Sequence, residues 1–167
     1  GNDLYGQCNP MGIPRAVLYP DPVEFYQLPD RVLQHFEWHY GLRTIWTDGR
    51  KLPTLPVDLP RWWGYSVGRW DGDVLVVESN GYTDRSWLDF AGHPHTEQLR
   101  ITERYTRRDV GHIDVQVSMV DSKVYAKPIT FKMPMALQAD TEMLEGFCEN
   151  HHKSRERMTT TKPAQVV

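Results

Sequence analysis

Apolar residues recur at every second position along two neighbouring segments in the second half of the chain. Within residues 98–108 they are Leu99, Ile101 and Tyr105, and within residues 112–120 they are Ile113, Val115, Val117 and Met119. A period of two is typical of β-strands with one buried face. The pattern therefore predicts two half-buried antiparallel strands.

The loop between these two segments sets their register. A three-residue loop, Asp109-Val110-Gly111, places Ile101 opposite Met119 and brings both apolar faces to the same side of the sheet, whereas a two-residue loop would bury the wrong face. Gly111 is then expected to adopt the left-handed backbone conformation of a G1 bulge.

In this register Glu103 points to the apolar face, opposite Val117. Burying an ionised carboxylate without a partner would cost several kcal/mol, so Glu103 must be paired, hydrogen-bonded or shifted toward protonation. A structural ion pair with Arg43, Arg50 or Arg15 is one interpretation. The other is a role in ligand binding or proton transfer, because ligand cavities commonly hold one polar anchor.

Shorter runs of β-branched and aromatic residues predict further strands at residues 23–28, 32–38, 42–46, 64–70 and 73–78. Asp71-Gly72 between the last two predicts a hairpin with a type I′ turn. One short helix is expected at residues 141–150.

So many strands with so little helix predict an all-β fold. We expect an antiparallel meander closed into a barrel or a strongly curved sheet, with a two-sheet sandwich as the alternative. Residues 1–152 are expected to form a single β domain. Residues 153–167 lack periodicity and are expected to form a flexible or partner-bound tail.

Composition narrows the class of protein. The chain has 167 residues, of which 40 % are hydrophobic and 25 % charged, as in globular domains. The formal net charge of −3 indicates no attraction to nucleic acid or to an anionic membrane surface. The longest aliphatic run, Val74–Val77, is far too short to span a bilayer. We therefore expect no nucleic-acid partner and no membrane-spanning segment.

Several other residues are candidates for ligand binding. Asp48 and Arg50 lie in the turn Thr47-Asp48-Gly49-Arg50, where a loop salt bridge is the alternative to binding a polar group. The chain is rich in tryptophan and tyrosine, which suggests an aromatic-lined pocket, a docking surface or simply core packing. The candidate ligand-binding set is Glu103, Arg43, Arg50, Asp48, Trp63, Tyr65 and Tyr105.

A weak metal motif is formed by His93 and His95. In an extended segment both rings point the same way, so they could bind one ion with Glu97 or His112 as a third ligand. Ordinary loop histidines are the alternative. The chain has no serine-hydrolase elbow and no nucleotide-binding glycine loop, and no cofactor is expected.

The two cysteines, Cys8 and Cys148, do not form a C-x-x-C pair. From the residues alone, a disulfide between them and two separate buried thiols both stay open.

Several motifs together resemble a family of uncharacterised exported bacterial proteins, plentiful in acidobacteria and some proteobacteria, over Cys8 to Asn150. The motifs are Gly12-Ile13-Pro14-Arg15, Arg43-x-Ile45-x-x-Asp48-Gly49-Arg50, Trp63-Gly64-Tyr65-Ser66-x-Gly68-Arg69-Trp70-x-Gly72-Asp73, Gly92-His93-Pro94-His95-x-Glu97 and Glu103-Arg104-Tyr105. Family members carry a signal peptide and a further N-terminal region, so the start of this chain is expected to be a processed or trimmed end. The resemblance implies a periplasmic or secreted location, which favours pairing of Cys8 with Cys148. It implies no reaction.

Two functional hypotheses follow from these observations. The first is an exported β-barrel domain that binds a small amphipathic ligand or serves as an accessory subunit of a larger assembly, with Glu103 as a polar anchor. The second is a lyase, isomerase or hydrolase that uses Glu103 or a histidine as general acid–base, with Arg43 or Arg50 holding an anionic group.

Overall fold

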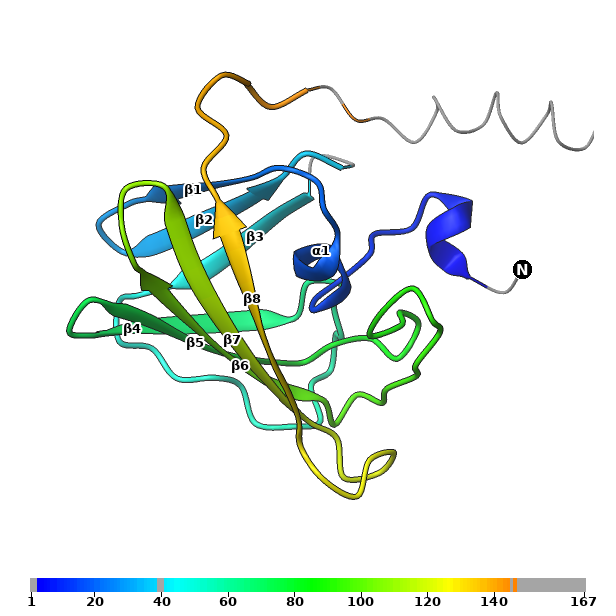
Figure 1. Cartoon of the computed structure of the whole chain (residues 1–167). Coiled ribbons are helices and arrows are strands. Elements are labelled where there is room, and N and C mark those ends of the chain that lie inside the picture. The colour runs from blue at the N-terminus through cyan, green and yellow to red at the C-terminus, as the bar shows by residue number, and fades with distance from the viewer. Residues whose placement is uncertain (1–2, 39–40, 145, 147–167) are drawn as a thin grey trace, which may run out of the picture.

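The computed structural model describes residues 3–38, 41–144 and 146. Eight strands form one sheet in which neighbours in space are also neighbours in sequence. The strands are β1 (Val23–Gln27), β2 (Arg31–Phe36), β3 (Gly41–Trp46), β4 (Tyr65–Asp71), β5 (Val74–Asn80), β6 (Arg100–Arg107), β7 (His112–Val120) and β8 (Ile129–Ala136). The predicted all-β class is confirmed (Figure 1).

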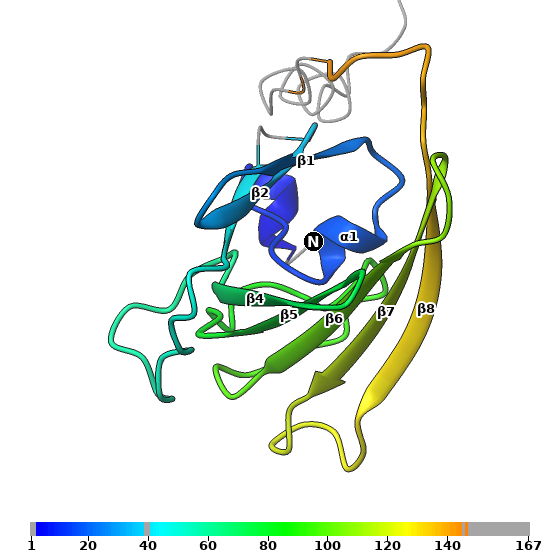
Figure 2. The same cartoon turned by 90° about the vertical axis from the view of Figure 1, so that its left-hand side faces the viewer.

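The sheet curls into a half-barrel whose edge strands are β1 and β8 (Figures 1 and 2). A short helix, α1 (Arg15–Leu18), lies in the opening between the β1–β2 hairpin and the strands on the β8 side (Figure 2). A 3-10 helix, η1 (Leu4–Gln7), precedes it. The strongly curved sheet was predicted, whereas α1 and η1 were not.

One strand pair departs from the expected antiparallel meander. β3 and β4 are parallel, with Ile45 opposite Ser66 and Trp46 opposite Val67. Parallel neighbours need a long connection that returns the chain to the same end of the sheet. The proline-rich residues 47–64 supply that connection, and the sheet is therefore mixed.

The predicted register of the β6–β7 hairpin is confirmed, with Ile101 opposite Met119. The prediction for Gly111 is wrong, because Gly111 is not among the glycines with positive φ. The Asp109 carboxylate instead accepts a hydrogen bond from the Gly111 backbone N–H at 2.8 Å. A side-chain contact thus stabilises this turn without left-handed backbone.

The β4–β5 hairpin is also confirmed, but its turn differs from the prediction. Asp71 pairs with Val74, so the loop residues are Gly72 and Asp73. Gly72 has φ +59°, whereas Asp73 does not have a positive φ. A type I′ turn needs positive φ at both positions, so this part of the prediction is wrong.

Strand β8 was not predicted from the sequence. The predicted helix at residues 141–150 is absent from the part of that segment that the structure describes. Residues 141–144 and 146 are not helical. The remainder of that helix, Cys148 and the predicted tail at residues 153–167 lie outside the described residues. Within the described ranges, no helix is long and apolar enough to cross a membrane.

The apolar core lies on the concave face of the sheet, where α1 covers part of it. Alternate residues of the strands supply most of this core, including Val32, Phe36, Ile45, Leu75, Val77, Ile101, Val115, Val117 and Met119. From α1, Ala16 and Val17 pack against them.

Candidate functional site

Glu103 lies on the concave face of β6, opposite Val117, and is completely buried. Arg43 of β3 is its partner: the guanidinium donates through Nη1 to Oε1 at 3.0 Å and through Nη2 to Oε2 at 2.5 Å. Both side chains are about 1 % exposed. Of the three arginines considered from the sequence, Arg43 therefore supplies the cation.

The remaining donors of Arg43 are also used. Nε donates to Ser66 Oγ at 3.0 Å, Nη1 to Gln34 Oε1 at 3.1 Å and Nη2 to Ser79 Oγ at 3.3 Å. A guanidinium has five N–H donors, and here each has an acceptor. Burial opposes the charge, but attraction to Glu103 outweighs it and raises the pKa of Arg43 above its ordinary value. The cation is permanent and fully bonded.

Tyr105 completes the coordination of the carboxylate. Its hydroxyl donates to Glu103 Oε1 at 2.7 Å and accepts from Gln34 Nε2 at 3.3 Å. Burial, together with the charge of Glu103, raises the pKa of Tyr105 well above its ordinary value, so the phenol keeps its proton. Glu103 thus accepts three hydrogen bonds, which fits the structural ion pair proposed from the sequence.

Asp48, Arg50 and Tyr65 come together elsewhere, outside the buried network. Arg50 pairs with Asp48 at 2.5 Å and donates to the Tyr65 hydroxyl at 3.2 Å. Its guanidinium also lies 3.6 Å from the Trp46 ring centre, and Arg31 lies 4.1 Å from the same centre. Hydrogen bonds from Arg50 lower the pKa of Asp48 to about 2. This solvent-exposed cluster matches the loop salt bridge considered as the alternative.

Trp63 belongs neither to the buried network nor to the exposed cluster. Its ring is stacked on that of Phe36, with 5.2 Å between the ring centres. A side chain at Gly41 would meet the Trp63 ring at 2.5 Å, so the absence of one allows this stacking. The predicted ligand-binding residues therefore fall into three separate groups rather than one pocket.

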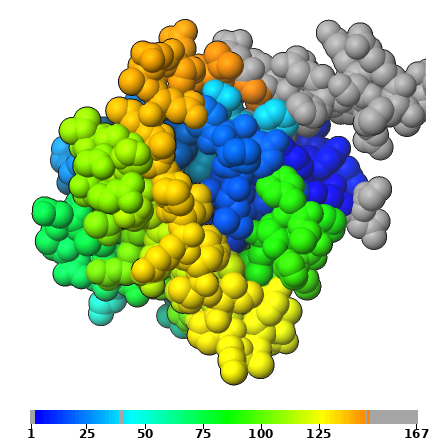
Figure 3. Space-filling view, in the orientation of Figure 1, coloured from blue at the N-terminus to red at the C-terminus, as the bar shows by residue number. Residues whose placement is uncertain are grey.

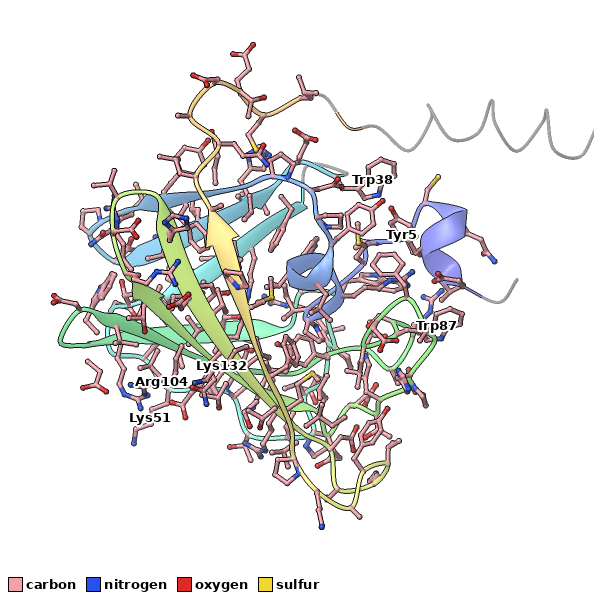
Figure 4. All side chains as sticks on the ribbon, viewed as in Figure 1. Tyr5, Trp38, Lys51, Trp87, Arg104 and Lys132 are labelled. Carbon is pink, nitrogen blue, oxygen red and sulfur yellow. The ribbon has the colours of Figure 1, made fainter. Side chains whose placement is uncertain are left out.

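Arg15 has its own partner, Asp3, with contacts of 2.9 and 2.7 Å. Its guanidinium also lies 4.2 Å from the Phe90 ring centre and 5.7 Å from that of Trp87. Tyr5 and Trp87 lie on the same side of the molecule (Figure 4), where the N-terminal segment meets the loop that follows β5 (Figure 3). Arg15 therefore joins these two segments.

The two candidate metal ligands point to different partners. Exposed His93 contacts the Asp89 carboxylate through Nδ1 at 2.6 Å. Buried His95 contacts Ser86 Oγ through Nε2 at 2.9 Å and the Thr96 carbonyl through Nδ1 at 3.2 Å. Burial lowers the pKa of His95. Among the described residues, no group of three or more His, Cys, Asp and Glu side chains could hold a metal ion.

The Ser86–His95 contact resembles a nucleophile–base pair, which sequence reasoning did not consider. Both side chains are buried, at 7 % and 4 % exposure. The backbone of Gly12 covers Ser86, because a side chain added there would meet Ser86 Oγ at 3.3 Å. The pair therefore lies in the buried part of the loop that follows β5, beside the Gly12 backbone.

The open side of the half-barrel holds a groove of about 690 Å³, which we call the α1–β8 groove. Its apolar lining includes Val23, Phe25, Phe36, Ile113, Met133 and Met135. Its polar lining includes Asp21, Glu24, Arg107, His112, Gln138 and Glu142. Glu103, Arg43 and Tyr105 do not line it.

A second, much smaller space adjoins this groove. It is a void of about 10 Å³, which we call the Asp21 void, lined by Pro10, Met11, Ala16, Tyr19, Asp21, Phe36, Trp38 and Trp63. Ala16, Tyr19, Asp21 and Phe36 line both spaces. Trp63 is thus the one predicted ligand-binding residue that lies beside either of them.

Sequence reasoning missed the groove because it missed β8. The signal was present, since Ile129, Phe131, Met133 and Met135 alternate with Thr130, Lys132 and Pro134. That period of two predicts a strand with one apolar face. The position of α1 opposite this face depends on long-range packing and has no comparable signal.

Comparison with known protein families, with curated proteins and with solved structures finds no match. The fold and its surfaces therefore define the protein: an all-β half-barrel with a buried ion-pair network and an open apolar groove.

Proposed function

We propose that this protein is a binding domain that takes a small amphipathic molecule into the α1–β8 groove. The observation that carries the proposal is the groove itself, with its volume of about 690 Å³ and its apolar lining. Small-molecule sites typically enclose about 300–1,000 Å³ and are lined mostly by apolar side chains with a few polar groups.

The groove lies where the sheet leaves apolar side chains without a partner layer. Phe25 of β1, Ile113 of β7 and Met133 and Met135 of β8 are only partly buried, although they belong to the concave face. Covering such surface gains about 25 cal/mol per Å² of apolar area. The two methionines add adaptability, because their unbranched side chains adjust to ligands of different shape.

The polar groups around the groove favour an amphipathic rather than a purely apolar ligand. Acidic Asp21 and Glu24 and basic Arg107 and His112 border the apolar lining. A ligand with an apolar body and one polar group can bury the first and leave the second among these side chains.

Binding is favoured over proton transfer by the contacts of Glu103. Both carboxylate oxygens are occupied by Arg43, and Tyr105 adds a third hydrogen bond. The carboxylate is completely buried and does not line the groove. A proton-transfer role would require breaking this network, whereas binding in the groove leaves it intact.

We further propose that the protein works in the periplasm or outside the cell, with Cys8 and Cys148 joined. The family resemblance supports this location, and the described part of the chain contains no free cysteine. Oxidising compartments are where such bonds persist.

The binding experiment uses 1-alkanols of six to ten carbons, titrated calorimetrically. If the chain enters the groove, each added methylene should tighten binding about fourfold, because burying a CH₂ gains about 0.8 kcal/mol. Met133→Glu places a charge on the groove face of β8 and should weaken binding of decanol at least about tenfold.

Thr130→Glu is the matched control, because it adds the same charge on the exposed opposite face of the same strand. It should leave decanol binding unchanged. Equal effects of the two variants, or no dependence on chain length, would reject the groove as the binding site. Circular dichroism of both variants checks that the fold is retained.

A further inference from the structure

We propose that the polar group of the ligand is a protonated primary amine, held between Asp21 and the aromatic rings of the Asp21 void. This inference rests on the proposed binding function and specifies the chemical class of the ligand. It is carried by an unpaired carboxylate oxygen, by the walls of the void and by the continuity of the void with the groove.

The first observation concerns the Asp21 carboxylate. Its Oδ2 atom is buried and has no hydrogen-bond partner among the described residues. A buried acceptor without a donor costs free energy, more so when it is charged. Burial, and then the charge of nearby Glu37, raise the pKa of Asp21. A cationic donor would relieve both unfavourable contributions.

The second observation concerns the walls of the void. Tyr19, Phe36, Trp38 and Trp63 surround the space that Asp21 borders. Aromatic faces attract cations, most strongly where water is excluded. A carboxylate beside several aromatic rings is therefore a chemical environment suited to an ammonium group.

The size of the void selects among ammonium groups. Its volume of about 10 Å³ is close to the minimum of roughly 10–15 Å³ that holds one water-sized centre. One ammonium nitrogen fits this space, whereas a trimethylammonium group is too bulky. A primary amine can also donate a hydrogen bond to Oδ2, which a quaternary ammonium cannot.

The third observation is the continuity between the two spaces. Ala16, Tyr19, Asp21 and Phe36 line both the groove and the void. An alkyl chain that lies in the groove can therefore place its terminal group beside Asp21. The void extends the groove rather than forming an unrelated site.

The basic groups that line the groove, and the acidic Glu24, already have partners. Arg107 donates to the Asp109 and Val110 carbonyls, and His112 contacts the Asp109 carboxylate at 2.8 Å. Glu24 accepts a hydrogen bond from Tyr26. An anionic head group would have to displace existing contacts, whereas an ammonium group meets an acceptor that has none.

The test compares decylamine, decanol and decyltrimethylammonium at pH 7, each titrated calorimetrically below its micelle-forming concentration. The wild-type protein should bind decylamine about tenfold or more tightly than decanol, because a hydrogen bond to a charged group is worth more than one between neutral groups. Decyltrimethylammonium should not share this preference.

Asp21→Asn keeps the shape of the side chain and removes its charge. It should reduce the preference for decylamine over decanol to less than about threefold. Glu24→Gln is the control, because it removes an exposed carboxylate that borders the same groove. The preference should survive in this variant.

The outcomes separate this inference from the proposed function. Suppose that Met133→Glu weakens decanol binding, but that decylamine binds the wild-type protein no more tightly than decanol does. The amine inference is then wrong, and the proposed binding function stands. The inference is also wrong if the preference persists in Asp21→Asn or if decyltrimethylammonium shares it. If neither decanol nor decylamine binds, both proposals fail.

Discussion

Arg43 on β3 and Glu103 on β6 are joined by two hydrogen bonds of 3.0 and 2.5 Å, although β4 and β5 lie between their strands in the sheet. The pair can reach across two intervening strands only because the sheet is curled. It therefore ties the curvature of the half-barrel to the pairing of two buried charges.

Glu103→Gln should lower the free energy of unfolding by about 3–5 kcal/mol, because it leaves the buried Arg43 cation without its counter-charge. Denaturation in guanidinium chloride measures this loss. Glu78→Gln is the matched control, since Glu78 pairs with Arg69 at 2.8 Å while 46 % exposed. Exposed pairs contribute about 0–1 kcal/mol. Similar losses in the two variants would contradict a structural role for the buried pair.

Replacing both members of the buried pair should cost less than replacing one. In Arg43→Met combined with Glu103→Leu, no unpaired charge remains in the core, and apolar replacements of buried pairs are often nearly neutral. We expect the double variant to be more stable than Glu103→Gln in the same denaturation assay. A double variant that is less stable would show that the hydrogen bonds to Gln34, Ser66 and Ser79 are needed independently of charge.

His95 should make stability depend on pH below neutrality. Burial lowers its pKa in the folded protein, opposed by the Thr96 carbonyl and the charges of Asp121 and Asp84. The unfolded chain then binds the proton more readily, so stability falls as pH decreases from about 6.5 through the lowered pKa. Urea denaturation between pH 5 and 7.5 should show this slope.

His95→Gln should flatten the pH dependence in that range, because glutamine does not titrate. His93→Gln serves as the control, since His93 is exposed and contacts Asp89 rather than the core. If the pH dependence of stability is retained in His95→Gln but lost in His93→Gln, it arises from His93, and the prediction for His95 is wrong.

Gly64 is required by both its backbone conformation and its neighbours. It has φ +64°, and an added side chain would meet the Tyr82 ring at 2.5 Å and the Asn80 carbonyl oxygen at 2.8 Å. Gly64→Ala should therefore cost more than the roughly 1–3 kcal/mol of a left-handed alanine alone. Gly49→Ala isolates the backbone contribution, because Gly49 has φ +84° with open space around it. Thermal unfolding of both variants should rank Gly64→Ala as the less stable.

Local features of the fold could be predicted because they depend on short patterns. Alternation in residues 98–120 fixes both strand faces, and the loop length fixes the pairing of Ile101 with Met119. The inward direction of Glu103 follows from the same register. The turn at Gly111 could not be predicted this way, because the Asp109 side chain supplies an alternative hydrogen bond.

The candidate site was harder to predict because it depends on contacts between distant segments. The identity of Arg43 as the partner of Glu103 requires the curl that brings β3 toward β6. The groove similarly requires α1 and β8 to face each other across the opening (Figure 2). Neither arrangement leaves a periodic signal in the sequence, so residues that share a motif, such as Arg43 and Arg50, lie in different places.

The proposed disulfide between Cys8 and Cys148 can be tested by peptide mapping of unreduced protein. A cross-linked peptide containing both residues is expected, and it should disappear on reduction. Closing a loop of about 140 residues is worth roughly 4–5 kcal/mol through restriction of the unfolded chain. Reduction should therefore lower the unfolding temperature, while two free thiols detected in unreduced protein would contradict the pairing.

Asp21 provides a prediction on the ligand-free protein that is independent of any binding assay. Because burial raises its pKa in the folded state, the folded chain holds this proton more tightly than the unfolded chain. Stability contributed by this group therefore falls as pH rises from the ordinary value of about 3.8 through the raised pKa. At pH 7 the charged carboxylate is destabilising, so Asp21→Asn should unfold at a higher temperature than the wild type.

The difference between Asp21→Asn and the wild type should shrink as pH falls toward 3.8, because both side chains are then neutral. Glu24→Gln, which removes an exposed carboxylate from the same groove, should show no comparable gain at pH 7. If Asp21→Asn is instead less stable than the wild type at pH 7, the Asp21 charge must already be compensated within the protein. An incoming ammonium group would then find no unpaired acceptor in the Asp21 void.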